Sequence, residues 1–278
     1  MANQEKVYQV KGLAEVGGFV DTASNALLNA VPSCRVNGSA EVGGFVWKAV
    51  SAPAGTQVNS LENYVNNSGS GEPLGFVYRV QDVALPCGEG YTLAIPQGQP
   101  CPVASRGRFF AKSTTAAVDG QKVLANVNNG KITTGADAVS ASAGTLNFKA
   151  VSAYSGWTST TSGSLKLNID GNEVALTGLN FGSVTSLADI ATVLDTALNN
   201  VADCAVNTET TGLIFTSKTT GANSSVAYVA SASDIGTLLG ASTASNVVAT
   251  QGVDAQVDTK WVVKSNASAG NLFIIERA

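Results

Sequence analysis

Few side chains in this sequence have the types and spacing that enzymatic chemistry requires. The 278 residues include no histidine, which is the usual general base at neutral pH and the commonest metal ligand. Ser-His-Asp hydrolysis, Cys-His proteolysis and His-ligated zinc are therefore excluded. The Asp and Glu residues are scattered, and no pair has the apolar context and spacing of an acid–base couple. The serines have no recognisable base to activate them. These features predict a protein that is not an enzyme.

The remaining candidate motifs favour structural roles. The Asp-Gly pairs at Asp119 and Asp170 lack the other ligands of an EF-hand loop, so they indicate hairpin turns. The four cysteines form no CxxC pair, which favours buried thiols and leaves a Cys87–Cys101 disulfide open. We therefore expect no cofactor and no metal ion.

The charge of the chain argues against nucleic acid as a partner. The formal net charge is −4, whereas nucleic-acid-binding domains carry basic patches. The one basic and aromatic cluster, residues 106–110 (RGRFF), therefore favours a local interface or an ion pair. No apolar run of about 18 residues is present, and the polar N-terminus lacks the pattern of a signal peptide. We expect no membrane partner and synthesis in a cytoplasm.

Short apolar runs separated by Gly and Asn-Gly turns predict a mainly β fold. Asn129-Gly130 is a hairpin signal, because both residues tolerate the backbone of a tight turn. The expected strands cover residues 75–80, 122–127, 131–133, 260–264 and 271–275. A β-barrel or β-sandwich is the architecture that such strands favour.

One heptapeptide, AEVGGFV, occurs twice, at residues 14–20 and 40–46. Neither copy continues into a phosphate-binding motif, and two copies are too few for a solenoid. We favour two similar strand-and-turn units whose glycines allow close backbone approach. The alternative is an exposed glycine-rich arm that lies along a partner. The flexible sequence at 68–71 (SGSG) predicts a boundary, so that residues 1–72 form an N-terminal arm or repeat region.

A second change in composition, over residues 135–163, has the Ala, Ser, Thr and Gly content of a linker. Beyond it, Leu165, Leu167 and Ile169 alternate with polar residues as in a half-buried strand. A capping box at Ser186 and Asp189 begins a helix with an aliphatic stripe. Further strands are expected at 212–217 and 225–230, followed by a helical turn at 233–239. This β-β-α-β-β-α order predicts a small α+β module over residues 153–252.

Four stretches outside this module share features of one family. They are residues 98–103 (GQPCPV), 106–109 (RGRF), 118–126 (VDGQKVLAN) and the closing hairpin at 259–276. These stretches resemble the β domain of bacteriophage capsid decoration proteins, also called structural cement proteins. The resemblance implies a discontinuous domain, residues 73–150 plus 253–278, that is interrupted at a loop, where insertions are tolerated.

Inside the module, a second resemblance rests on residues 186–191, 212–222, 238–240 and 250–252. These residues resemble a module of phage tail-sheath-type structural proteins. The fold class that we expect is therefore mainly β with a small α+β insertion. A cement-like β-barrel or sandwich would be split by the β-β-α-β-β-α module, and the module would project outward.

The resemblance implies a non-enzymatic virion protein, made in the bacterial host cytoplasm and located on the outer surface of the phage head. Its partner would be the major capsid protein. As a homotrimer it would bind the expanded head and stabilise contacts between neighbouring capsid subunits. The alternatives are a tail structural protein of the sheath or tube, and a virion protein that contacts the host surface through residues 153–252.

The candidate capsid contacts lie in the N-terminal region, if that region is an arm. Aromatic residues and Arg dominate interface hot spots, and an arm would therefore use the largest of them. These residues are Tyr8, Phe19, Arg35, Phe45 and Trp47. In the alternative interpretation, Phe19 and Phe45 fill equivalent core positions in the two repeat units.

Overall fold

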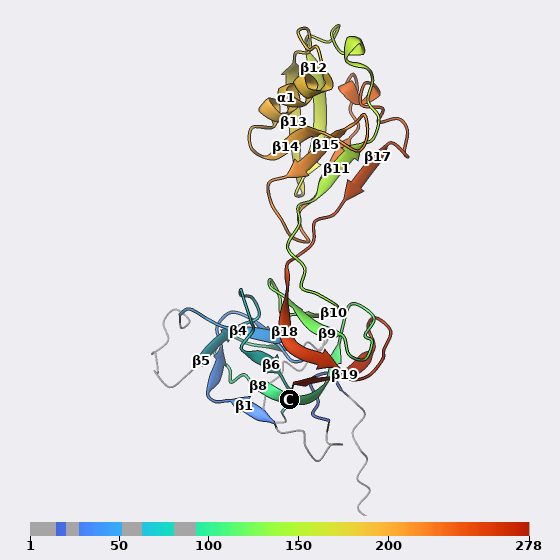
Figure 1. The fold of residues 1–278 in the computed structure, drawn as a ribbon. Coiled ribbons are helices and arrows are strands. Elements are labelled where there is room, and N and C mark those ends of the chain that lie inside the picture. The colour runs from blue at the N-terminus through green and yellow to red at the C-terminus, as the bar shows by residue number, and fades with distance from the viewer. Residues whose placement is uncertain (1–14, 21–27, 52–62, 81–92, 278) are drawn as a thin grey trace, which may run out of the picture. The chain divides into compact units, whose positions relative to one another are not determined.

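A computed structural model describes residues 15–20, 28–51, 63–80 and 93–277 (Figure 1). The chain divides into two compact units. Unit 1 comprises Met1–Val139 and Gln256–Ala278, and unit 2 comprises Ser140–Ala255. Among the described residues, no helix is long and apolar enough to cross a membrane.

Unit 1 is built from short strands. They are β1 (Asn29–Val31), β2 (Cys34–Val36), β3 (Ala40–Glu41), β4 (Phe45–Lys48), β5 (Asn63–Asn66), β6 (Gly75–Val77), β7 (Ala94–Ile95), β8 (Val103–Lys112), β9 (Lys122–Asn126), β10 (Ile132–Gly135), β18 (Gln256–Val263) and β19 (Leu272–Arg277). The main sheet has the order β10-β9-β18-β19-β8-β6-β4-β5-β2, with β1 also paired to β8, and β3 pairs with β7. The mainly β class that the sequence predicts is confirmed.

An aromatic cluster forms the core of unit 1. Phe45 of β4, Phe76 of β6, Phe109 of β8 and Trp261 of β18 are each at most 1% exposed. Their ring centroids lie between 5.2 and 6.1 Å apart, in edge-to-face and tilted pairs. Such pairs are favourable beyond the area that they bury. Because Trp261 is one of these rings, the strand that follows unit 2 in the sequence completes the core of unit 1.

The sheet continues across the boundary that the sequence suggests near residue 72. Strand β4, before that point, pairs with β6, after it. The stretch at 68–71 is itself packed, because Trp47 Nε1 donates to the carbonyl of Gly71 at 2.9 Å and the indole covers Gly69. Strands β1, β2, β4 and β5 therefore belong to the same sheet as the strands that follow residue 72, and these segments do not form a separate arm.

Three cysteines are buried as free thiols. Cys34 and Cys101 lie on neighbouring segments of unit 1, where the Cys101 N–H donates to the Cys34 carbonyl at 2.9 Å. Burial raises the pKa of the Cys34 thiol to about 11 and that of Cys101 to about 12. Cys204 is buried in unit 2. Cys101 is a free thiol in this structure, and Cys87, the other member of the disulfide that the sequence leaves open, lies outside the described residues.

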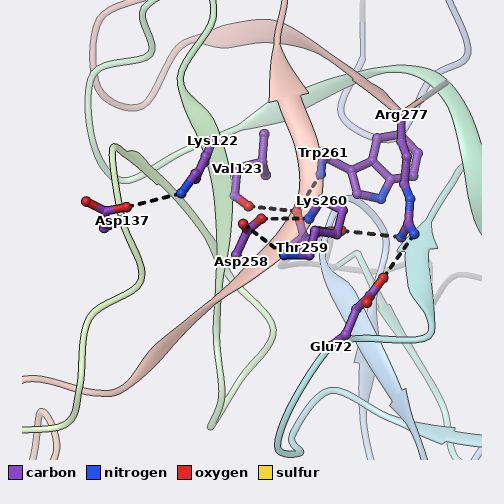
Figure 2. Close-up of polar contacts among 9 residues, drawn as sticks. All are labelled: Glu72, Lys122, Val123, Asp137, Asp258, Thr259, Lys260, Trp261 and Arg277. Carbon is purple, nitrogen blue, oxygen red and sulfur yellow. Dashed lines mark hydrogen bonds and ion pairs between the residues drawn. The ribbon is translucent and has the colours of Figure 1, made fainter.

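Strand β18 contains a bulge that turns Trp261 into the core (Figure 2). The register with β9 shifts between Asp258 and Trp261, and Lys260 adopts a left-handed backbone with φ of 65°. Thr259 is fully buried, donates its hydroxyl to the Val123 carbonyl at 2.7 Å and accepts the Trp261 N–H at 3.2 Å. The Thr259 hydroxyl thus replaces ladder hydrogen bonds that the bulge interrupts.

Arg277, at the end of β19, joins the C-terminal strands to the earlier part of the sheet (Figure 2). Its guanidinium lies 2.9 Å from the Glu72 carboxylate and 3.4 Å from the Thr259 carbonyl. Both side chains of the ion pair are partly exposed, so the pair adds little stability. The aromatic core, rather than this ion pair, holds β18 and β19 in place.

Unit 2 contains two small sheets and one α-helix. Its elements are β11 (Thr145–Phe148), η1 (Tyr154–Gly156), β12 (Gly163–Ile169), β13 (Asn172–Leu179), α1 (Leu187–Leu198), β14 (Ala202–Val206), β15 (Leu213–Ser217), β16 (Val226–Val229), η2 (Ile235–Thr237) and β17 (Val247–Thr250). The sheet orders are β14-β15-β11-β17 and β13-β12-β16. One continuous apolar core joins both sheets to the helix.

Helix α1 follows the local signals in the sequence. Ser186 Oγ accepts the Asp189 N–H at 3.2 Å, and the Asp189 carboxylate accepts the Ser186 N–H at 3.0 Å. This is the expected capping box, with Asp in place of Glu. Ile190, Leu194 and Leu198 are buried on one face of the helix, as their spacing predicts.

The linker expected over residues 135–163 is wrong in its central part. Residues 145–148 form β11, which lies between β15 and β17 in the four-stranded sheet. Leu146 and Phe148 of this strand are at most 1% exposed. The Ser- and Gly-rich neighbours of these two side chains gave the segment the composition of a linker, although the alternation of Leu146 and Phe148 is that of a strand.

Candidate functional site

The two copies of the repeated heptapeptide form equivalent turns in unit 1. The Gly18 N–H donates to the Glu15 carbonyl at 2.9 Å, and the Gly44 N–H donates to the Glu41 carbonyl at 3.1 Å. Identical sequences therefore close turns of the same length at corresponding positions.

Each turn also pairs with a strand in the same way. The Gly17 N–H donates to the Phe110 carbonyl in β8, and the Gly43 N–H donates to the Val77 carbonyl at the end of β6, both at 2.8 Å. In each case the strand residue returns a 2.8 Å hydrogen bond to the carbonyl of the next glycine. The repeat thus encodes one backbone arrangement that is used twice.

The two turns pack against each other reciprocally. Gly17 has φ of 79° and Gly43 has φ of 88°, in the left-handed region that favours glycine. A Cβ on Gly43 would lie within 3.0 Å of Val16 Cγ1, and a Cβ on Gly17 would lie within 3.0 Å of Val42 Cγ1. This close approach is the structural role that we favoured for the glycines of the repeat.

The two phenylalanines of the repeat are not equivalent. Phe45 is 1% exposed and belongs to the aromatic core, whereas Phe19 is 39% exposed. Phe19 lies on the rim of that core, with its ring edge-to-face on Phe109 at 5.6 Å. The alternative in which both rings fill equivalent core positions is therefore wrong, because the two turns pair with different strands.

The other candidate contacts from the sequence are dispersed. Trp47 is only 4% exposed and Phe45 only 1%, so neither side chain projects from the surface as an arm contact would. Arg35 of β2 is half-buried, and its Nη1 donates to the Gly98 carbonyl at 3.0 Å. Tyr8 lies outside the described residues. Of the five candidates, Phe19 and Arg35 are the described ones with accessible surface.

A cavity of about 620 Å³ opens beside the two repeat turns, within unit 1. The lining side chains include Val16, Val42, Phe45, Lys112 and Lys131, which come from the two turns, the end of β8 and the hairpin between β9 and β10. No local pattern distinguished Lys112 and Lys131 in the sequence, because they line the same cavity from segments that are separate in the sequence. Residues of both copies of the repeat, among them Val16 and Val42, thus line one cavity.

The described residues offer no catalytic or metal-binding constellation. They contain no group of three or more His, Cys, Asp or Glu side chains that could hold a metal ion. The three described cysteines are buried, and burial raises the pKa of each thiol, which disfavours the reactive thiolate. Within the basic and aromatic cluster, Arg108 lies 3.9 Å from Glu276 on the neighbouring strand. This contact is an ion pair within the sheet, as the sequence suggested.

Charge is divided unequally between the two units. Unit 2 contains three Lys, no Arg and eight Asp or Glu, a formal net charge of −5. The other 13 basic and 12 acidic side chains belong to unit 1. The acidic character of the chain therefore resides in unit 2.

Comparisons with known families match both parts of the chain. The model of the insert domain of E217 tail sheath protein gp31 matches residues 138–253, which nearly coincide with unit 2. The model of the structural cement protein family (E217 gp24/Pam3 gp6) matches residues 4–181, more than half of the chain. The two matches overlap over residues 138–181, and a comparison with curated proteins finds no match. The chain belongs to the phage structural cement protein family, and its role is that of a structural, non-enzymatic component of the virion.

Proposed function

We propose that this protein binds the outer surface of the expanded phage head and stabilises contacts between neighbouring major capsid subunits, acting as a homotrimer. The observation that carries the proposal is the match to the cement family, which includes both repeat turns, the strands of unit 1 up to β10 and all of the cavity lining except Ala269 and Gly270. A protein that binds only the assembled lattice stabilises that lattice by mass action. This role needs no titrating group and no cofactor.

We also propose that unit 2 is a module inserted into the cement domain and that it projects outward from the head. The match to the tail sheath insert begins and ends within two residues of the limits of unit 2. The ends of both units support an insertion. Val139 and Gln256 exchange hydrogen bonds of 3.1 and 2.7 Å in unit 1, and Ser142 and Val253 exchange bonds of 2.9 and 3.2 Å in unit 2. Ends that meet as a two-stranded ribbon allow insertion at a single loop.

The test is binding of the purified chain to undecorated expanded heads and, in parallel, to tail tubes. We expect saturable co-sedimentation with heads and an increase in the melting temperature of the heads. The oligomeric state of the free protein, measured by light scattering, checks the trimer. Absence of binding to heads would refute the proposed role.

A tail role is the second candidate, because the module in unit 2 matches a domain of a tail sheath protein. This candidate predicts binding to tail tubes, or helical polymers in negative stain. A third possibility, contact with the host surface through residues 153–252, predicts that isolated unit 2 binds host cells. The acidic charge of unit 2 favours a basic target for such a contact.

A further inference from the structure

The cavity beside the repeat turns has an apolar floor and a basic rim. Val42, Phe45 and Ile132 are buried side chains that line it, each at most 2% exposed. Lys112 and Lys131 also line it and are exposed. Its volume of about 620 Å³ lies in the range of ligand pockets, roughly 300 to 1,000 Å³.

The two lysines at the rim have no carboxylate partner among the residues that the structure describes. By contrast, Lys122 of β9 is paired with Asp137, and Lys260 of β18 is paired with Asp258. Glu41 is the acidic residue of the lining, and none of the ion pairs between described residues includes it. The rim therefore carries a net positive charge that is not neutralised within the described part of unit 1.

The wall formed by the repeat turns is rigid. Each turn is closed by its own hydrogen bond and pairs with a strand, and the valine of each covers the glycine of the other. The opposite wall is held as well, because the Phe45 N–H donates to the Gly130 carbonyl of the β9–β10 hairpin at 2.9 Å. A preformed cavity loses little conformational entropy when it binds a ligand.

We propose that this cavity binds an extended acidic segment of the major capsid protein, with an apolar side chain on the floor and a flanking carboxylate at Lys112 and Lys131. The inference rests on the proposed binding to the head. Charge complementarity selects an acidic segment, since exposed unpaired lysines attract carboxylates and a basic segment would be repelled. The two repeat turns then form the rigid wall of the binding site.

The test measures binding of undecorated expanded heads to the full-length protein and to three variants. K112E/K131E reverses the charge at the rim. K48E/K264E makes the same change in net charge at two exposed lysines that do not line the cavity. Glu41→Gln removes the negative charge from the lining. Circular dichroism and melting confirm that each variant is folded.

We expect K112E/K131E to weaken head binding by about tenfold or more, and K48E/K264E to change it by less than about threefold. Glu41→Gln should strengthen binding, and the salt dependence of binding should be smaller for K112E/K131E than for the unmodified protein. Equal effects of the two double variants would overturn the cavity proposal while leaving head binding intact. If K112E/K131E changed the oligomeric state in light scattering, the occupant would be a second copy and the proposal would also fail. If the unmodified protein did not bind heads, the proposed function and this inference would both fail.

Discussion

Val16 packs over Gly43 so closely that a Cβ on this glycine would overlap the valine side chain. The same relationship, with the copies exchanged, joins Val42 to Gly17. The repeat is therefore a pair of mutually supporting turns, and each glycine is required both by its left-handed backbone and by the side chain of the other copy.

Replacing Gly43 with Ala should destabilise unit 1 by about 3 kcal/mol, because a left-handed alanine is strained and its methyl group would displace Val16. The free energy of unfolding in denaturant measures the effect. Gly120→Ala is the matched control. Gly120 has φ of 84°, but a methyl group at this position would meet no other atom within 4 Å, so this variant should lose only about 1 kcal/mol. Equal losses would show that Val16 does not constrain Gly43.

The buried hydroxyl of Thr259 supports the second prediction. Thr259→Val keeps the shape of the side chain but removes the hydrogen bonds to the Val123 carbonyl and the Trp261 N–H. The expected loss is about 2 kcal/mol, the cost of leaving buried backbone groups unpaired. Thr114→Val, at an exposed position, should change stability by less than about 0.5 kcal/mol. Denaturant unfolding followed by tryptophan fluorescence measures both, and similar values would contradict the role of Thr259 in the bulge.

The Asp170 carboxylate makes the stability of unit 2 depend on pH. Burial alone would raise the pKa of this carboxyl group, but hydrogen bonds from the Ser225 N–H and the hydroxyls of Ser217 and Thr219, each 2.8 Å long, hold it below its ordinary value. Because the folded pKa lies below the unfolded one, the stabilisation is complete above the unfolded pKa of about 3.9. It is lost as the pH falls through the folded pKa.

Asp170→Asn should therefore destabilise unit 2 at neutral pH by only about 1 kcal/mol, because partial solvent exposure screens the lost interactions. The variant should also lose less stability than the unmodified protein as the pH falls. Asn also tolerates the left-handed backbone of Asp170, whose φ is 53°. The control is Asp203→Asn, which breaks an exposed ion pair with Lys218 and should have a smaller effect. Melting curves between about pH 3 and 7 measure both. If the melting temperature of Asp170→Asn fell with decreasing pH as steeply as that of the unmodified protein, Asp170 would not be the cause of the pH dependence.

Local signals in the sequence predicted some elements well. The alternation of Leu165, Leu167 and Ile169 corresponds to β12, and the capping box of Ser186 and Asp189 begins α1. Both signals act between residues close in sequence. Strands β11, β14 and β17 were not predicted, and each has only four or five residues. β11 and β17 pair with strands far along the chain, whereas β14 pairs with the next strand, β15.

The candidate site was harder to predict for the same reason. The repeat was visible in the sequence, but the difference in burial between Phe19 and Phe45 depends on the strand with which each turn pairs. Lys112 and Lys131 come together only because β8 and the β9–β10 hairpin line the same cavity. Identical heptapeptides thus occupy different environments, which sequence identity alone does not reveal.

Excision of unit 2 provides the last prediction. Replacing residues 140–255 with an Asn-Gly turn should leave unit 1 folded, because Val139 and Gln256 are already hydrogen-bonded partners at the point of closure and β18 and β19 remain attached. The excised segment should fold alone as well, since it has its own core around the fully buried Trp157. Circular dichroism and the fluorescence of Trp157 in the isolated segment measure folding.

Head binding then separates the roles of the two units. If unit 1 provides the contact with the capsid, the excised protein should bind expanded heads with an affinity within about threefold of the full-length protein. Isolated unit 2 should not bind, because it lacks the cavity and its charge of −5 offers no basic rim. If isolated unit 2 bound heads and the excised protein did not, the capsid contact would lie in unit 2, the module that matches the tail sheath insert domain.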